Sequence, residues 1–305
     1  STPDRTEYYG EGHLVRVELD ENGDGKIDLW NFYDPMGRLE KQEQDSKHTG
    51  HVDTWVTLDP ATGKELRVLK DTVGDGKVHS WRTNDASGQT VRLEEDKNGD
   101  GKADRVVEFE GGKPVRVVED TNFDGKPDLR QELDAQGQVV REERDTKGTG
   151  VFDLRVAYAN GQKIKEERDT KGAGRYDVVT TFENGVPVRQ QQDTKGTGSF
   201  DSTIVFQNGK EAREERDTKG RGKADLVLTF DAQGRPAREE IDTNGDGKAD
   251  VVKIYENGVL VREEADRDFD GRFELVTFYK DGVPVRSEAD TNGDGKPDVI
   301  VEYEG

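Results

Sequence analysis

Aspartate and asparagine recur along the chain in a nine-residue pattern, Asp-x-Asn-x-Asp-Gly-x-x-Asp, of which the segment from Asp20 to Asp28 is one copy. Hard cations such as Ca²⁺ take six to eight oxygen ligands. In loops of this kind, positions 1, 3 and 5 supply side-chain oxygens, position 7 supplies a backbone carbonyl, and a glycine at position 6 permits the sharp turn. The pattern therefore predicts calcium-binding loops.

Six copies of the loop are intact, and one of these ends in Glu274 instead of Asp. We expect about six bound Ca²⁺ ions, one in each intact loop. The expected ligands, with the position-7 residue acting through its carbonyl oxygen, are Asp20, Asn22, Asp24, Lys26, Asp28, Asp96, Asn98, Asp100, Lys102, Asp104, Asp120, Asn122, Asp124, Lys126, Asp128, Asp242, Asn244, Asp246, Lys248, Asp250, Asp266, Asp268, Asp270, Arg272, Glu274, Asp290, Asn292, Asp294, Lys296 and Asp298.

The other six copies have lost ligands. Five carry lysine at position 3 and no aspartate at position 5. In these loops the ammonium group is expected either to bridge the carboxylates of positions 1 and 9, where the ion would lie, or to remain solvated beside a degenerate loop. The sixth, which begins at Asp71, has Val73 and His79 in ligand positions, so we expect it to bind calcium weakly or not at all.

The loops define a repeat that runs through the whole chain. Position 1 falls at residues 20, 45, 71, 96, 120, 145, 169, 193, 217, 242, 266 and 290, in steps of 24 to 26 residues. A fixed period of this length is typical of stacked repeat architectures, in which each unit packs on its neighbours. The sequence predicts a single repeat domain over residues 1–305, with a half repeat at 5–19.

Each unit contains two short apolar-polar segments separated by a turn signal. The segments are too short for helices and are rich in Val, Ile, Tyr and Phe, which favours β-strands. Asn160-Gly161 and Asn257-Gly258 are typical of type I′ hairpins, and Asp34 to Gly37 of a type I turn followed by a left-handed Gly. We therefore predict an all-β fold, in which tandem 24-residue β-hairpin repeats form one continuous, coiled antiparallel meander with its aromatic residues on the concave side. The alternative is a six-bladed β-propeller.

The composition bounds the function. The formal net charge is −21, there are no cysteines, and no apolar run is long enough to cross a membrane. The acidic field disfavours nucleic acid as a partner. The apolar residues form a thin stripe that cannot by itself offset the chain entropy, so folding is expected to depend on calcium. No nucleophile, phosphate-loop or dinucleotide motif is present, and an enzyme is not expected.

Two parts of the repeat resemble known families. The Asp-x-Asn-x-Asp-Gly-x-x-Asp loop resembles the calcium loops of FG-GAP and integrin-α propellers, of thrombospondin type 3 repeats and of dockerins. The hairpin from Phe32 to Leu39 is similar to the YD repeats of Rhs-type proteins, and that from Tyr255 to Gly258 to the MORN-like hairpins of bacterial YwqK-type proteins. These resemblances imply extended or coiled β-sheets with extracellular roles.

Two further sets of residues could bind ligands. The four histidines, His13, His48, His51 and His79, share no ligand spacing, and we interpret them as solvated loop residues. A row of arginines occurs at one place in the returning strand of nine units, with Lys165 in a tenth. It is interpreted either as cross-strand pairing with the adjacent glutamates or as a ladder for a linear polyanion such as a surface polysaccharide. The arginines are Arg67, Arg92, Arg116, Arg141, Arg189, Arg213, Arg238, Arg262 and Arg286.

These features favour a calcium-stabilised extracellular repeat protein of bacterial type, with a structural or adhesive role at the cell surface. A glycan- or protein-binding module that uses the concave face or the arginine row is one alternative, and a calcium buffer is another. The intact loops lack the bidentate Glu at position 12 of an EF-hand, so their sites suit millimolar calcium. That predicts an extracellular, periplasmic or outer-membrane surface location, with a lipid anchor upstream of Ser1 as one means of attachment.

Overall fold

The computed structural model describes residues 4–304, which form strands, turns and loops without a helix. Its 25 strands belong to one antiparallel sheet. Contacts divide the chain into two compact units, residues 1–155 and 156–305, and each is described by itself. Among the described residues there is accordingly no helix that could span a membrane.

The strands are four to seven residues long. The first unit holds β1 (Arg5–Gly10), β2 (His13–Leu19), β3 (Leu29–Tyr33), β4 (Leu39–Gln44), β5 (Thr54–Leu58), β6 (Glu65–Lys70), β7 (Ser80–Asn84), β8 (Thr90–Glu95), β9 (Arg105–Glu110), β10 (Lys113–Glu119), β11 (Leu129–Leu133) and β12 (Val139–Arg144). The second holds β14 (Gln162–Arg168), β15 (Val178–Glu183), β16 (Val186–Gln192), β17 (Ser202–Gln207), β18 (Lys210–Arg216), β19 (Leu226–Phe230), β20 (Pro236–Ile241), β21 (Val251–Glu256), β22 (Val259–Ala265), β23 (Leu275–Lys280), β24 (Val283–Ala289) and β25 (Val299–Glu302). Strand β13 (Leu154–Ala159) includes the boundary between the units.

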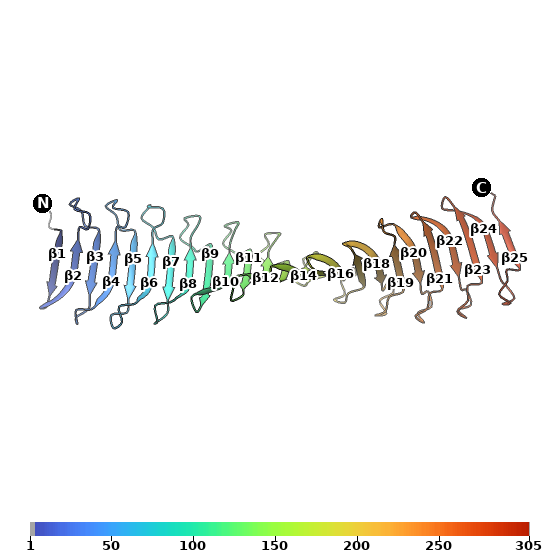
Figure 1. Ribbon diagram of the computed structural model, residues 1–305, viewed down its shortest axis with the longest axis horizontal. Helices are drawn as coiled ribbons and strands as arrows, with labels where there is room; N and C mark the ends of the chain where they lie inside the picture. The colour runs from blue at the N-terminus through green and yellow to red at the C-terminus, as the bar shows by residue number, and fades with distance from the viewer. Residues whose placement is uncertain (1–3, 305) are drawn as a thin grey trace. The chain divides into compact units, whose positions relative to one another are not determined.

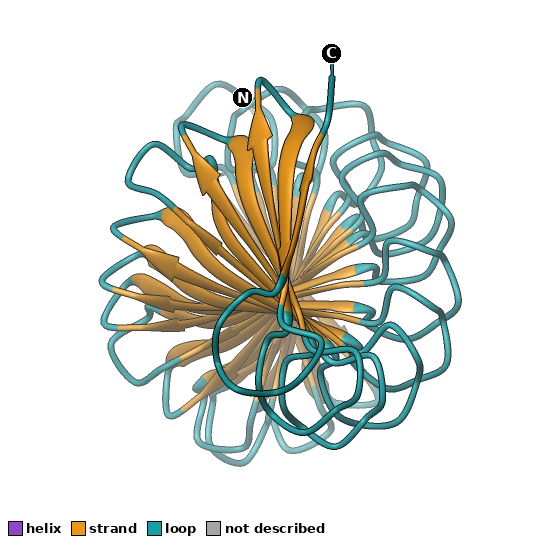
Figure 2. Cartoon of the chain, turned by 90° about the vertical axis from the view of Figure 1, so that its right-hand side faces the viewer, coloured by secondary structure: helices purple, strands orange, loops and turns teal. Residues whose placement is uncertain are grey.

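Within each unit every strand pairs with the strand before it and the strand after it, as Figure 1 shows for the strands in chain order. The predicted meander of β-hairpin repeats is therefore confirmed. The alternative of a six-bladed propeller is wrong, because a blade is a separate four-stranded sheet and the pairing from β1 to β12 continues without a break. Successive strands of a unit are rotated relative to one another (Figure 2), as the right-handed twist of strands requires.

The hairpin turns have the predicted geometry. Asn160 and Gly161 have φ values of 52° and 73°, which are the two positive values that a type I′ turn needs. At the longer turn only Gly37 is left-handed, and its N–H donates to the carbonyl of Asp34 at 2.8 Å. Length variation between repeats is thus absorbed at the hairpin tips, and the strands keep their register.

The apolar core is thin and is not confined to one face of the sheet. In the second unit the row of Ile204 continues at Lys253, so the buried Val252 beside it lies on the other face. Val56 lies opposite Val68, and Val107 lies opposite Val117, in the middle of adjacent strands. Each of these side chains is buried, whereas aromatic residues such as Phe109 are half-buried. The deepest burial therefore belongs to mid-strand aliphatic residues and not to the aromatics at the strand ends.

The arginine row is paired with glutamates along its own strands. Side chains two residues apart lie on the same face of a strand, and in seven of the ten members of this row the cation reaches the acid two positions further on. Arg116 pairs instead with Glu108 of the neighbouring strand at 3.7 Å, and Arg67 and Arg189 have Leu69 and Gln191 at that place. The N–O distances are 3.0 Å for Arg92–Glu94, 2.8 Å for Arg141–Glu143, 2.9 Å for Arg213–Glu215, 2.8 Å for Arg238–Glu240, 2.6 Å for Arg262–Glu264, 2.6 Å for Arg286–Glu288 and 2.7 Å for Lys165–Glu167. The row is thus paired with glutamates, but mainly along the same strand and not across strands as expected; the cross-strand pairs are longer, for example 3.4 Å for Arg92–Glu108.

The central row should carry more stability than the exposed apolar residues. We expect Val107→Ala to lower the free energy of unfolding by about 1.5–3 kcal/mol, because two methyl groups leave a packed row and the gap cannot fully close. Val205→Ala, at a side chain that is 39% exposed, is the matched control and should cost much less. Urea unfolding at fixed calcium measures both variants, and equal effects would contradict the assignment of the core.

Candidate metal centres

The aspartate loops lie along one edge of the sheet in each unit. Each loop connects an even-numbered strand to the next odd-numbered strand, and each hairpin turn makes the opposite connection. In an antiparallel meander the two kinds of connection must then lie at opposite edges, visible as the loops at the two ends of the strands in Figure 2. The repeated carboxylates are therefore stacked side by side, one loop for every two strands.

Within a loop the carboxylates organise the backbone. In the first loop Asp20 accepts the N–H groups of Gly23 (2.7 Å) and Gly25 (2.8 Å), and Asp28 accepts the N–H of Glu21 at 2.9 Å. The amide oxygen of Asn22 accepts the N–H of Asp24 at 2.7 Å. In this loop the acids at positions 1 and 9 are buried, and Asp24 at position 5 is exposed. The carboxylate oxygens of the loop thus accept hydrogen bonds from several of its backbone N–H groups.

The other predicted ligands occupy equivalent places. Position-1 acids accept N–H groups of their own loops at Asp96, Asp120, Asp242, Asp266 and Asp290. Position-3 oxygens accept the position-5 N–H at Asn98, Asn122, Asn244, Asp268 and Asn292. Position-5 acids accept the position-7 N–H at Asp24, Asp100, Asp124, Asp246, Asp270 and Asp294, from Lys26, Lys102, Lys126, Lys248, Arg272 and Lys296. Position-9 acids accept the position-2 N–H at Asp104, Asp128, Asp250, Glu274 and Asp298.

Sequence reasoning missed the threonine at position 2. Its hydroxyl donates to the position-9 carboxylate in loops of both kinds, for example from Thr121 to Asp128 at 2.8 Å and from Thr194 to Asp201 at 2.9 Å. The recurring Asp-Thr pair was the available signal. This hydroxyl fixes the acid that closes the loop.

The loop from Asp266 to Glu274 has the geometry of a cation site. Asp266, Asp268, Asp270 and Glu274 each place a carboxylate oxygen within 4.8 Å of the others. Atom Oε1 of Glu274 is buried and has no hydrogen-bond partner. Burial, and then the neighbouring carboxylate of Asp268, raises the pKa of Glu274. Four converging acids with an unsatisfied buried oxygen fit a hard divalent cation with oxygen ligands.

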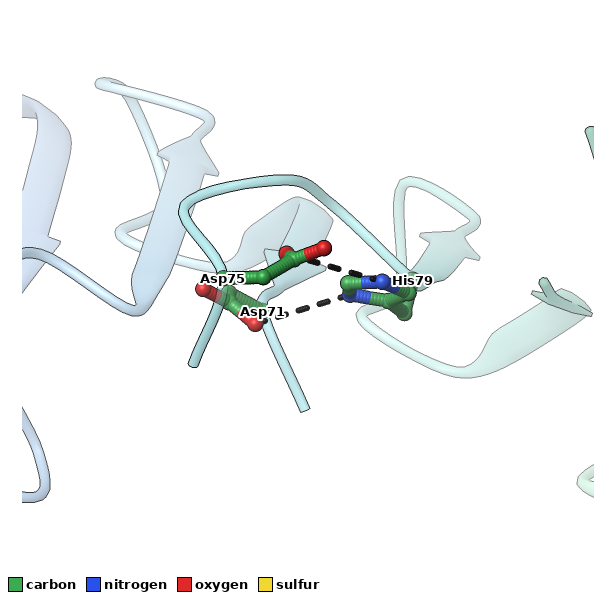
Figure 3. A group of neighbouring side chains, drawn as sticks. All are labelled: Asp71, Asp75 and His79. Atoms are coloured by element: carbon green, nitrogen blue, oxygen red, sulfur yellow. Dashed lines mark ion pairs between the residues drawn. The ribbon is translucent and has the colours of Figure 1, made fainter. Parts of the chain in front are cut away.

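A second group of ligand atoms lies in the loop that begins at Asp71. Asp71, Asp75 and His79 place one ligand atom each within 4.8 Å of one another, and the imidazole faces both carboxylates (Figure 3). The N–O distances are 3.5 Å to Asp71 and 3.6 Å to Asp75. The interpretation of the histidines as solvated is wrong for His79, which is only 5% exposed, because position 9 is buried in most loops.

The lysines of the degenerate loops act between loops. The expected bridge inside their own loop is wrong for Lys47, Lys171, Lys195 and Lys219, whose ammonium groups donate to backbone carbonyls of the next loop. Lys195, for instance, donates to the carbonyls of Asp217 (2.6 Å) and Thr218 (2.9 Å). The other three make the same pair of contacts. The ammonium group of Lys147 lies 3.6 Å from the position-9 acid of its own loop, Asp153.

Comparison with known proteins identifies no family. No family model matches the chain, and no curated protein matches it. Among solved structures, it is similar to accessory secretory protein 1, 2 and 3 of Streptococcus pneumoniae, at 19% identity over 29% of this chain and 17% of that one (TM-score 0.25). It is also similar to TcdB2-TccC3-Cdc42, at 12% identity over 94% and 21% (TM-score 0.19), and TcdB2-TccC3-TEV, at 14% over 98% and 20% (TM-score 0.21). The chain spans about a fifth of the length of these proteins, and scores this low carry no argument about function.

Acid should destabilise the fold through the loop carboxylates. Burial raises the pKa of Asp71 and Asp96, but backbone N–H donors outweigh burial and hold the pKa of each below the ordinary value of 3.8. A folded-state pKa below the unfolded value gives stability that is present above the unfolded pKa and is lost as the pH falls through the folded pKa. Urea midpoints in EDTA should therefore fall as the pH is lowered from about 5 to about 2. A midpoint that stays constant across this range would refute the mechanism.

Loss of an inter-loop lysine should cost stability without changing calcium binding. We expect Lys195→Met to lower the free energy of unfolding by about 0.5–1.5 kcal/mol, since two backbone carbonyls lose their charged donor. Lys223→Met removes the same charge from the next loop, where the structure gives the side chain no such contact, and serves as the matched control. Equal unfolding midpoints for the two variants would show that the contact contributes nothing.

Proposed function

We propose that this chain is a calcium-stabilised extracellular repeat protein with a structural or adhesive role at the cell surface. The observation that carries the proposal is the group formed by Asp266, Asp268, Asp270 and Glu274, with its unsatisfied buried oxygen. Its residues would hold the ion through carboxylate oxygens, as Ca²⁺ prefers. The five other intact loops have aspartate at positions 1, 5 and 9 and asparagine at position 3, and they share the same backbone hydrogen bonds.

The energetics of the fold support this role for the ion. The buried apolar residues are few and mostly valine, so the apolar contribution per residue is small beside the conformational entropy that folding removes. Six Ca²⁺ would bring twelve positive charges to a chain whose formal net charge is −21. Because the unfolded chain has no assembled loop, the binding free energy of each ion adds to the stability of the folded state.

The proposed extracellular location follows from the expected calcium affinity of the loops. Sites without a bidentate glutamate at position 12 suit the millimolar calcium found outside cells. A partner in this setting would be a surface polysaccharide or another cell-surface protein. Most members of the arginine row are paired with glutamates, so we propose no polyanion-binding role for it.

Removal of calcium should destabilise the chain, and a single acid should control a single ion. We expect the melting temperature to rise from EDTA to millimolar calcium, with about 2.7 kcal/mol gained at a site when calcium is a hundredfold above its dissociation constant. We expect Glu274→Gln to bind one ion fewer per chain than the wild type in calcium titration calorimetry, because it removes the closing ligand of one site.

Asp225→Asn is the matched control, since it alters the position-9 acid of a loop with lysine at position 3. It should leave the calcium stoichiometry unchanged. The proposal fails if the melting temperature is the same in EDTA and in calcium, or if both variants bind as many ions as the wild type.

A further inference from the structure

His79 takes the place of an acid in a loop that otherwise keeps its framework. Asp71 accepts the N–H groups of Gly74 (2.6 Å) and Gly76 (2.7 Å), as Asp20 does in the first loop. The backbone of His79 is held on both sides, by its own N–H bonded to Lys70 (2.8 Å) and by its carbonyl bonded to Asp96 (2.8 Å). The imidazole is therefore fixed at the position where calcium loops place their closing carboxylate.

The buried imidazole is not satisfied by the protein. Atom Nδ1 of His79 is buried without a hydrogen-bond partner. The nearest carboxylate oxygen, from Asp71, lies at 3.5 Å, longer than an N–H···O hydrogen bond of 2.7–3.2 Å. A buried ring nitrogen left unpaired costs free energy. Here it points into a group of two carboxylates, which is a donor set for a cation.

The chemistry of this donor set differs from that of the other loops. Calcium takes oxygen ligands, and the loop has replaced two of them, by Val73 at position 3 and by His79 at position 9. Imidazole nitrogen suits Zn²⁺, Cu²⁺ and Ni²⁺. One nitrogen and two carboxylates make three protein ligands, the number that zinc has in sites that keep a position for water.

From these observations we propose that Asp71, Asp75 and His79 form a site for an imidazole-preferring divalent metal ion of the zinc class, separate from the calcium loops. Asp71 and His79 supply the rigid, buried ligands. Asp75, whose side chain is 44% exposed, supplies the ligand on the solvent side. Asp71 and Asp75 also line a surface hollow, together with His51 of the preceding loop, through which an ion can reach the site.

The proposal is tested on the full chain with Co²⁺ and Zn²⁺ in millimolar calcium, so that oxygen-only loops are occupied. We expect one Co²⁺ per chain, with a visible absorption band that Zn²⁺ abolishes and further calcium does not. His79→Gln should weaken binding at least about 10–100-fold, the range that even the loss of an outer-shell partner produces. His51→Gln, at an exposed histidine beside the same hollow, is the matched control and should bind as the wild type does.

A double variant tests the same idea in the opposite direction. Val73→Asn with His79→Asp restores the intact loop pattern, so it should lose the Co²⁺ site. In wild-type protein, Zn²⁺ should shift the ¹⁵N resonances of the His79 ring and leave those of His48 unchanged, a readout that does not depend on any variant folding. The proposal is overturned if the wild type binds no Co²⁺, if the double variant or His79→Gln binds Co²⁺ as tightly as the wild type, or if the His79 resonances do not respond to Zn²⁺.

Discussion

Burial of the carboxylates at positions 1 and 9 of most loops is the constraint on which this structure depends. Asp28 and Asp45 are each only 1% exposed, and most of their counterparts in the other repeats are buried as well. A buried carboxylate is tolerated only if donors or a cation compensate for its lost hydration. Within each loop, backbone N–H groups donate hydrogen bonds to these carboxylates. The sharp turns that orient the N–H groups require left-handed residues such as Gly25, whose φ is 89°. The backbone conformation that gives the loop its shape therefore also supplies the donors that compensate the buried carboxylates.

The backbone donors leave room for different additional partners. In the loop beginning at Asp96, the amide nitrogen of Asn98 lies 3.3 Å from the carboxylate of Asp104. Asp28 receives the imidazole of His48 from the neighbouring loop at 2.9 Å, and this contact, the largest cause, lowers the pKa of Asp28. The same contact raises the pKa of His48. The same loop backbone therefore accommodates an amide, an imidazole or a cation beside the carboxylates. This explains why the loops recur at a near-constant spacing although their side chains have diverged.

The fold could be predicted from the sequence because its signals are local and repeated. Asn-Gly turns, short alternating strands and a constant period each depend on residues close in the chain, and twelve copies make the pattern unambiguous. The buried central row was missed because Val56 and Val107 stand in alternating segments where either face could be inward. The inter-loop role of Lys195 was missed because its partners are 22 and 23 residues away, and only the stacking of loops brings them together. The burial of His79 likewise follows from loop geometry and not from its neighbours in sequence.

The stacking of the loops also brings many carboxylates close together along one edge of the sheet. Loops recur every two strands, about 9.6 Å apart at the usual strand spacing, close to the Debye length of about 8 Å at physiological ionic strength. Adjacent loops with three carboxylates therefore repel one another through solvent. The run of loops from Asp145 to Asp217 has removed one acid per loop and added a lysine, and three of these lysines reach the following loop. Intact loops keep all their acids and carry no lysine at position 3, although they have cations elsewhere, such as Arg272 at position 7, which donates to the carbonyl of Gly293 at 3.3 Å. Where lysines are present, they reduce the repulsion between neighbouring loops. Where lysines are absent, this repulsion falls when divalent ions bind. Ion binding in one intact loop should therefore favour the folding of its intact neighbours.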